Sequence, residues 1–137
     1  MNKADFQRLT DIRITESQTL LRADSPDGAY YLAGYAVECA LKACISGTFS
    51  SREWPEKKFV NDCYTHVLAD LIRLAKLDAV LRADAVTDPS FGRNWNDVKD
   101  WNEHCRYQSH SHAKAQNLID AIIQPVSGVL QWIKAHW

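Results

Sequence analysis

The sequence predicts an all-α protein, an up-and-down bundle of four to five helices that forms a single domain over residues 1–137. Apolar residues recur at steps of three and four along most of the chain, which is the pattern of amphipathic helices. Strand signals are almost absent, because no turn dipeptide separates two alternating runs. The length suits one domain, and 46% hydrophobic with 24% charged residues is typical of a soluble globular protein.

The first two helices follow from apolar spacing. The first covers residues 3–23, and Pro26 suits the first turn of the second, where its missing N–H costs no hydrogen bond. The second, residues 27–47, is apolar on nearly every side, which is typical of a central helix. The first helix is predicted to turn four apolar side chains toward the core: Phe6, Leu9, Ile12 and Leu20. The second is predicted to let neighbouring helices approach closely along a ridge of its own alanines: Ala29, Ala33, Ala36, Ala40 and Ala43.

The middle of the chain alternates polar connections with shorter helices. Residues 46–61 are predicted to be a polar connection, in which Arg52, Lys57 and Lys58 are solvated. A third helix is predicted over residues 64–75, with an extension through residues 77–86 after a short break. Residues 88–97 contain Pro, Gly and Asn, a composition that predicts a loop.

Two further helices are predicted, over residues 98–108 and from residue 113 to the end of the chain. The apolar register of the last helix continues on both sides of Pro125, so we expect one kinked helix. Ser109 and Ser111 are N-cap residue types placed directly before this helix. The chain is therefore expected to turn at the serines and to place His112 in the first turn of the last helix.

Composition limits the classes of partner and compartment. A formal net charge of −1 gives no overall basic field, so any nucleic-acid contact must be local. The start of the chain lacks the apolar run of a secretory signal, and the longest apolar segment, residues 29–45, is shorter than the ~20 residues of a membrane span. We therefore expect a cytoplasmic protein without membrane contact. Its cysteines form no CxxC pair and are predicted to be reduced, buried apolar residues: Cys39, Cys44, Cys63 and Cys105.

Residues 101–116 concentrate three histidines, an arginine and a cysteine. On an unbroken helix Arg106 would share a face with His110, four residues on, whereas a turn at the serines favours His112. A guanidinium and an imidazole beside the free N–H groups of a helix start suit a phosphate, with the imidazole as general acid or base. The alternative is that Arg106 forms a structural ion pair with Glu103 or Glu38 and that His112 only begins a helix.

Other polar residues have both a structural and a functional interpretation. No CxxC or HxxxH spacing supports a zinc site, and we expect no metal and no cofactor. Glu38 and Lys42, four apart on an apolar helix, are predicted to form an internal ion pair, and Glu38 is also a candidate for the site. Arg93 and Trp95 could offer a cation and a stacking surface to single-stranded RNA, the alternative being that Trp95 packs over the bundle end.

Residues 28–43 (GAYYLAGYAVECALKA) and 101–112 (WNEHCRYQSHSH) resemble the HEPN superfamily of small helical-bundle domains. The resemblance extends to the segment that begins at His66 and to the final helix near Trp132. It implies a homodimer. In ribonuclease members, an arginine, four to six intervening residues and a histidine line a cleft at the dimer interface and cut RNA without a metal. Arg106 and His112, with five residues between them, match that motif, whereas His110, with three, does not.

The resemblance leads to two hypotheses. The first is a metal-independent endoribonuclease of the toxin or defence class, in which Arg106 holds the scissile phosphate and His112 transfers protons as the ribose 2′-hydroxyl attacks. The second is a non-catalytic HEPN module that binds a nucleotide or a nucleotidyltransferase partner. Tyr107 favours the second, since active members often have Asn or Asp after the arginine. The candidate substrate-binding residues are Glu38, Lys42, Arg93, Trp95, Tyr107 and His110, and His104 and His110 are expected to face solvent.

Overall fold

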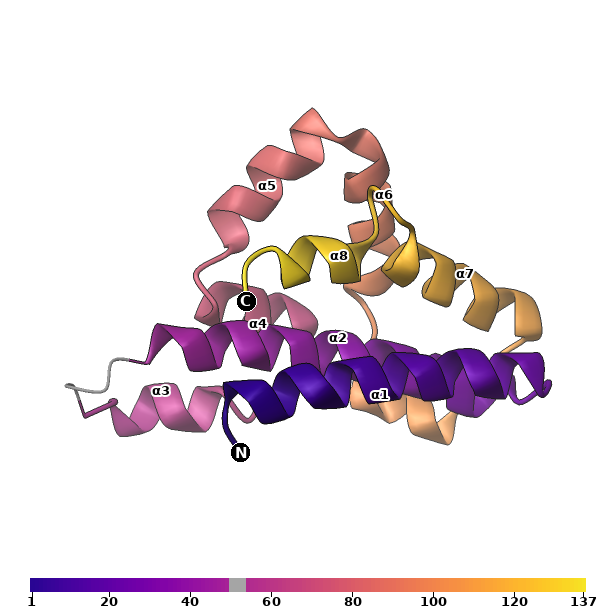
Figure 1. The fold of residues 1–137 in the computed structure, drawn as a ribbon, viewed down its shortest axis with the longest axis horizontal. Helices are drawn as coiled ribbons and strands as arrows, with labels where there is room; N and C mark the ends of the chain where they lie inside the picture. Colours follow the sequence, from indigo (N-terminus) through magenta and orange to yellow (C-terminus); the bar gives the residue numbers. More distant parts are fainter. Residues whose placement is uncertain (50–53) are drawn as a thin grey trace.

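The computed structural model describes residues 1–49 and 54–137, and these residues form a helical bundle without strands (Figure 1). Eight α-helices and one 3-10 helix are found there, more than the predicted four to five, because several elements are only one or two turns long. None of these helices is long and apolar enough to cross a membrane. The elements are α1 (Lys3–Arg22), α2 (Pro26–Thr48), α3 (Lys57–Asp62), α4 (Leu68–Leu74), α5 (Asp78–Thr87), α6 (Pro89–Val98), η1 (Glu103–Tyr107), α7 (His112–Ile123) and α8 (Val129–Lys134).

The central position of α2 confirms the prediction from its composition. Pro26 stands in the first turn, α1 lies antiparallel beside α2, and α4, η1, α7 and α8 contact its other sides (Figure 1). All five alanines of the predicted ridge are fully buried, so neighbouring helices pack closely against α2.

The face that α1 buries differs from the predicted one. Ile12, predicted to be inward, is 40% exposed, whereas Thr10, Ser17 and Leu21 are buried. The two buried hydroxyls are satisfied, since Thr10 donates to the carbonyl of Phe6 and Ser17 Oγ donates to the carbonyl of Ala29 at 2.7 Å. Apolar spacing could not identify this face because small hydroxyl residues occupy it.

The last two helices confirm one prediction and correct another. Helix α7 begins at His112 after the N-cap Ser111, as predicted. It ends at Ile123, however, and α8 begins at Val129, so the predicted kinked continuous helix is wrong. Pro125 and the turn that follows leave Val126 85% exposed, while Val129 and Ile133 are fully buried. The apolar residues on the two sides of Pro125 therefore keep a common spacing in the sequence although they lie on two separate helices.

The predicted loop at residues 88–97 and the predicted helix at residues 98–108 are both wrong. The first is helix α6, in which the side chain of Asp88 accepts hydrogen bonds from the N–H groups of Ser90 and Phe91, and Pro89 fills the first helical position. These are ordinary helix-start signals that the Pro, Gly and Asn content obscured. Residues 99–102 then leave the helix, and only η1 follows.

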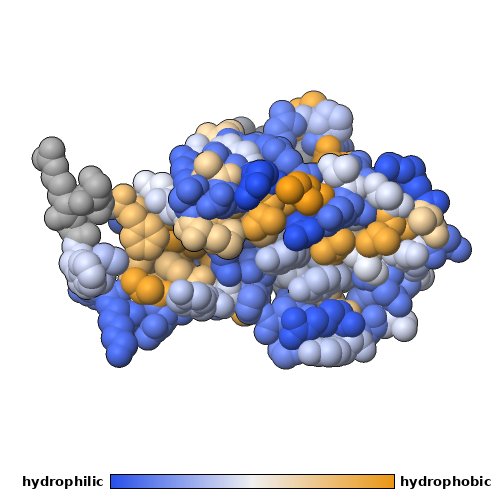
Figure 2. Space-filling view, turned by 60° about the horizontal axis from the view of Figure 1, so that its bottom comes forward, coloured by the Kyte–Doolittle hydropathy of each residue, from blue (hydrophilic) through white to orange (hydrophobic). Residues whose placement is uncertain are grey.

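Residues 54–87 contain three short helices. The third predicted helix, residues 64–75, is shortened to α4, and α5 confirms the predicted extension after a break. Helix α3 was not predicted; Lys57 and Lys58 at its start are exposed as expected, and Arg52 lies outside the described residues. Apolar side chains gather on the surface at the end of the molecule near α3 (Figure 2), where Phe49 is 43% exposed.

The four cysteines are unpaired, in agreement with the predicted reduced state. Cys39, Cys44 and Cys105 are buried, and burial raises the pKa of each of these thiols to about 11. Cys63 differs, because it is only partly buried, although burial also raises its pKa. Three of the thiols therefore serve as small apolar side chains.

Candidate functional site

The segment between η1 and α7 positions the predicted catalytic residues. Asn102 caps η1 by accepting a hydrogen bond from the N–H of His104, and the backbone is extended again at Gln108. Ser111 then caps α7 by accepting a hydrogen bond of 3.1 Å from the N–H of Lys114. The chain turns between η1 and α7, and α7 begins after Ser111, as the N-cap residue types predicted.

Arg106 and Tyr107 form an exposed pair at the end of η1. The guanidinium lies 4.9 Å from the centre of the Tyr107 ring, which is 76% exposed. Hydrogen bonding to the side chains of Tyr107 and then Tyr31 raises the pKa of Arg106. No ion pair joins Arg106 to Glu103, to Glu38 or to another carboxylate of the described chain, so the structural ion pair considered from the sequence is not formed.

His112 lies at the start of α7 with a different neighbour. Its Nδ1 is 3.3 Å from Oδ1 of Asp24, and the two side chains are 52% and 88% exposed. None of the hydrogen bonds, ion pairs and ring contacts of the described residues joins His112 to Arg106. A single chain therefore presents both groups to solvent without a direct contact between them.

His110, a candidate substrate-binding residue expected to face solvent, is buried, with 7% exposed. Its ring stacks on that of Tyr30 with the ring centres 4.0 Å apart, and its Nε2 lies 3.1 Å from the carbonyl oxygen of Cys105. Its backbone N–H donates to the carboxylate of Asp27. The expectation was wrong because the contacts with Tyr30 and Asp27 come from the start of α2, and Asp27 is 83 residues away in the chain.

Arg93 and Trp95 lie on α6 and do not form a joint surface. Trp95 is 8% exposed and belongs to the core, so it offers no stacking face to RNA, in agreement with the alternative that it packs over the bundle. Arg93 is exposed and donates to the hydroxyl of Ser90 at 3.0 Å. Of the two, only Arg93 is available to a ligand.

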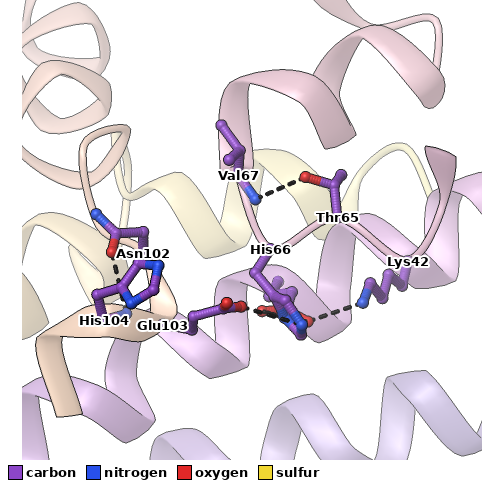
Figure 3. Close-up of polar contacts among 8 residues, drawn as sticks. Lys42, Thr65, His66, Val67, Asn102, Glu103 and His104 are labelled. Carbon is purple, nitrogen blue, oxygen red and sulfur yellow. Dashed lines mark hydrogen bonds and ion pairs between the residues drawn. The ribbon is translucent and has the colours of Figure 1, made fainter. Parts of the chain in front are cut away.

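A series of four alternating basic and acidic side chains connects α2 to η1; we call it the polar bridge and define it as Lys42, Glu38, His66 and Glu103. Lys42, His66 and Glu103 are labelled in Figure 3. Glu38 is 2% exposed and accepts a hydrogen bond of 2.8 Å from Lys42, which confirms the predicted internal pair. His66 Nδ1 lies 3.0 and 3.1 Å from the two oxygens of Glu38. On the other side of the ring, Nε2 lies 3.0 Å from Oε2 of Glu103, an ion-pair distance without hydrogen-bond alignment.

His66 and Glu103 were not among the predicted site residues. His66 is in the connection before α4, and its side chain remains 47% exposed although it is held on both sides. A sequence signal existed, since a buried Glu38 on an apolar helix requires more than one polar partner. The pattern gave no means of finding a partner 28 residues away, because the approach of α4 to α2 is a tertiary contact.

A groove of about 930 Å³ opens next to His112 between α6 and α7, and its lining includes Tyr30, Asn94, Ser111, Lys114 and Asn117. Lys114 is its single basic residue, and two carboxylates also line it. The groove is therefore not a phosphate-binding surface by charge. Two exposed cations around the start of α7 pair with no carboxylate of the described residues: Lys114, whose Nζ lies 5.2 Å from the centre of the Tyr30 ring, and Arg106, on η1.

In residues 1–49 and 54–137 no group of three His, Cys, Asp or Glu side chains is arranged to hold a metal ion. Comparison of the chain with protein-family models, with curated proteins and with solved structures finds no match.

Proposed function

We propose that the chain is a small RNA-binding module of the HEPN type that contacts a phosphate through Arg106 and a base through Tyr107. The observation that carries the proposal is the exposed Arg106–Tyr107 pair, in which the guanidinium has an aromatic neighbour and no carboxylate neighbour. A guanidinium binds phosphate oxygens in a planar fork, and an exposed ring offers a stacking face to any base. A net charge of −1 agrees with a local contact and not with a broad basic surface.

Fluorescence anisotropy with a labelled single-stranded RNA tests this proposal at several salt concentrations. Arg106→Ala is expected to raise the Kd and to reduce the slope of log K against log salt by about one, because one phosphate contact is lost. Tyr107→Ala is expected to weaken binding by about 1–3 kcal/mol without changing the slope, since stacking carries no charge. Arg82→Ala, at an exposed arginine of α5, is the matched control. Binding by Arg106→Ala equal to that of the wild type contradicts the proposal.

A second candidate function is metal-independent RNA cleavage by a homodimer. His112 favours it, because this exposed imidazole begins α7 and is separated from Arg106 by the five residues that the HEPN resemblance requires. In this mechanism the imidazole removes the proton of a ribose 2′-hydroxyl, which attacks the phosphate held by Arg106. The bond from phosphorus to the 5′-oxygen breaks, and the imidazolium gives its proton to that oxygen, leaving a 2′,3′-cyclic phosphate and a 5′-hydroxyl. Since the two side chains have separate neighbours within one chain, a second subunit would have to complete the site.

Cleavage is tested by incubating the protein with RNA and a chelator and looking for 2′,3′-cyclic phosphate ends by mass spectrometry. His112→Ala is expected to abolish cleavage, while His104→Ala, at an exposed histidine of η1, leaves it unchanged. Sedimentation establishes whether the active species is a dimer. Tight binding without turnover would leave the binding function alone, and equal turnover in wild type and His112→Ala would remove this mechanism.

The same surface is also a candidate contact for a nucleotidyltransferase partner. A complex with such a protein, together with no measurable RNA affinity, would assign Arg106 and Tyr107 to protein recognition in place of RNA binding. Toxicity on overexpression, compared between wild type and Arg106→Ala, tests whether Arg106 matters for the effect of the protein in cells under either outcome.

A further inference from the structure

We infer that His66 is a positioning residue that keeps the carboxylate of Glu103 away from Arg106 and so leaves the guanidinium available to a phosphate. The inference rests on the proposed function, because it identifies what keeps Arg106 free for RNA. It starts from the polar bridge, in which His66 Nε2 lies 3.0 Å from Oε2 of Glu103 (Figure 3).

Glu103 is the acidic residue that a short helix would normally offer to Arg106. The two residues are three apart on η1, and side chains at that spacing lie above one another in a 3-10 helix. An arginine and a carboxylate so placed attract each other across the helix surface. A competitor for the carboxylate accounts for the absence of this ion pair.

The other arginines of the described chain show what happens without a competitor. Three of them follow an acidic residue by three or four positions, and each pairs with it: Arg8 with Asp5, Arg73 with Asp70 and Arg82 with Asp78. Arg106 has the same spacing from Glu103 and does not pair. Two features distinguish Arg106 from these arginines: it lies on a 3-10 helix and not on an α-helix, and His66, from another segment, contacts the Glu103 carboxylate.

Glu38 makes this competition effective by fixing the imidazole. Both of its oxygens lie within 3.1 Å of His66 Nδ1, and its own position is fixed by burial and by Lys42. With Nδ1 held in this way, Nε2 on the far side of the ring is directed at Glu103. The guanidinium of Arg106 is left with Tyr107 and Tyr31, neither of which cancels its charge.

Binding of the labelled RNA to a pair of variants tests the inference. His66→Ala is expected to weaken binding about two- to fivefold at low salt, the size of one exposed arginine–carboxylate pair, because Glu103 then turns to Arg106. Glu103→Gln in the same chain is expected to restore wild-type affinity. If His66 merely supports the fold, the double variant binds as weakly as His66→Ala or more weakly, and that result overturns the inference. His104→Ala, next to Glu103 in the chain, is the matched control and should bind as the wild type does.

The Arg106 side chain supplies a measurement that does not depend on RNA. Its Nε–H resonance in the free protein is expected to shift in His66→Ala and to return toward the wild-type position in the double variant with Glu103→Gln. No shift in His66→Ala overturns the inference whatever the RNA data show. A shift in a protein that binds no RNA would instead remove the proposed function and leave the role of His66 standing.

Discussion

The hairpin of α1 and α2 and the chain from residue 88 to residue 111 are held in place by different kinds of contact. The hairpin consists of two long helices, and α2 is buried along most of its length. The second region, residues 88–111, contains a helix of ten residues, an extended connection and η1; α6 packs against α5, α7 and α8, whereas the connection and η1 lie against α2. Periodic apolar burial fixes the hairpin and α6, whereas the connection and η1 depend on particular long-range contacts.

The polar atoms of the second region show the difference most directly. Three buried side-chain N or O atoms of the described residues lack a hydrogen-bond partner, and all three lie there: Trp101 Nε1, Glu103 Oε2 and His110 Nδ1. Buried polar atoms are normally paired, and an unpaired one lowers stability. The segment that carries Arg106 is therefore less completely satisfied than the hairpin, and we expect it to open first.

Removing Glu38 should have the largest effect, because this buried carboxylate holds Lys42 and His66, and His66 in turn contacts Glu103 of the second region. Glu38→Ala leaves Lys42 and His66 without their shared carboxylate, and we expect a loss of about 3 kcal/mol in the free energy of unfolding, measured by urea titration. Glu16→Ala removes a more exposed ion pair with Arg13 in the hairpin and is expected to cost less than about 1 kcal/mol. Equal losses in the free energy of unfolding of the two variants would show that the buried ion pair is worth no more than the exposed one in this protein.

The apolar contact between the regions is tested at Gly34. A methyl group at this position would overlap the indole of Trp101, so Gly34→Ala is expected to cost about 1–3 kcal/mol in thermal unfolding. Gly47→Ala lies on the same helix, where the new carbon would be 3.5 Å from the nearest atom, Lys3 Nζ. Its stability should be unchanged or higher, since alanine favours helices. A stable Gly34→Ala protein would contradict the close fit of Trp101.

A smaller effect is expected at Asp27, which holds the end of the second region. Asp27→Ala removes the acceptor for the N–H of His110 and is expected to cost about 1 kcal/mol. Because the contact is local to this end, trypsin should cleave after Arg106 faster than in the wild type, while cleavage after Arg82 stays the same. Asp27→Asn retains an acceptor oxygen and should restore much of the protection. Unchanged cleavage after Arg106 in Asp27→Ala would show that other contacts hold the segment.

The smallest effect concerns acid stability at the start of the second region. Hydrogen bonds from the hydroxyl of Ser127 and from the N–H groups of Phe91 and Ser90 lower the pKa of Asp88. The folded state therefore favours the ionised carboxylate, and this contribution is present above the ordinary aspartate pKa of about 4 and is lost as the pH falls through the lowered pKa. The difference in Tm between wild type and Asp88→Asn should be constant above about pH 5 and shrink below about pH 4. A difference that grows on acidification would contradict this sign.

The sequence predicted the first region better than the second for a physical reason. The apolar spacing of residues 27–47 identifies a buried helix whatever its neighbours are. Ser111 before His112 fixes a helix start through a hydrogen bond to Lys114, only three residues further along the chain. The Asp88–Pro89 start of α6 was also readable, and the loop-like composition after it was given too much weight. The extended connection before η1 has one local signal, the N-cap Asn102, and otherwise depends on Trp101 packing on Gly34.

The candidate site divides in the same way. Sequence reasoning placed Arg106 and His112 on either side of a chain reversal and predicted the Glu38–Lys42 pair. It did not find that Glu38 holds His66, or that His110 is buried under Tyr30, since both contacts join distant segments. Apolar periodicity predicts which face of its own helix a residue occupies. It does not predict which side chain of another helix or loop that residue contacts.

The uneven burial of the cysteines makes selective labelling possible. Alkylating reagents react with the thiolate form of cysteine. This form is scarce at neutral pH for the three buried thiols with a pKa of about 11. Cys63, the partly exposed one, should therefore react first, so a maleimide dye can be attached to the native protein at one position without removing any other cysteine.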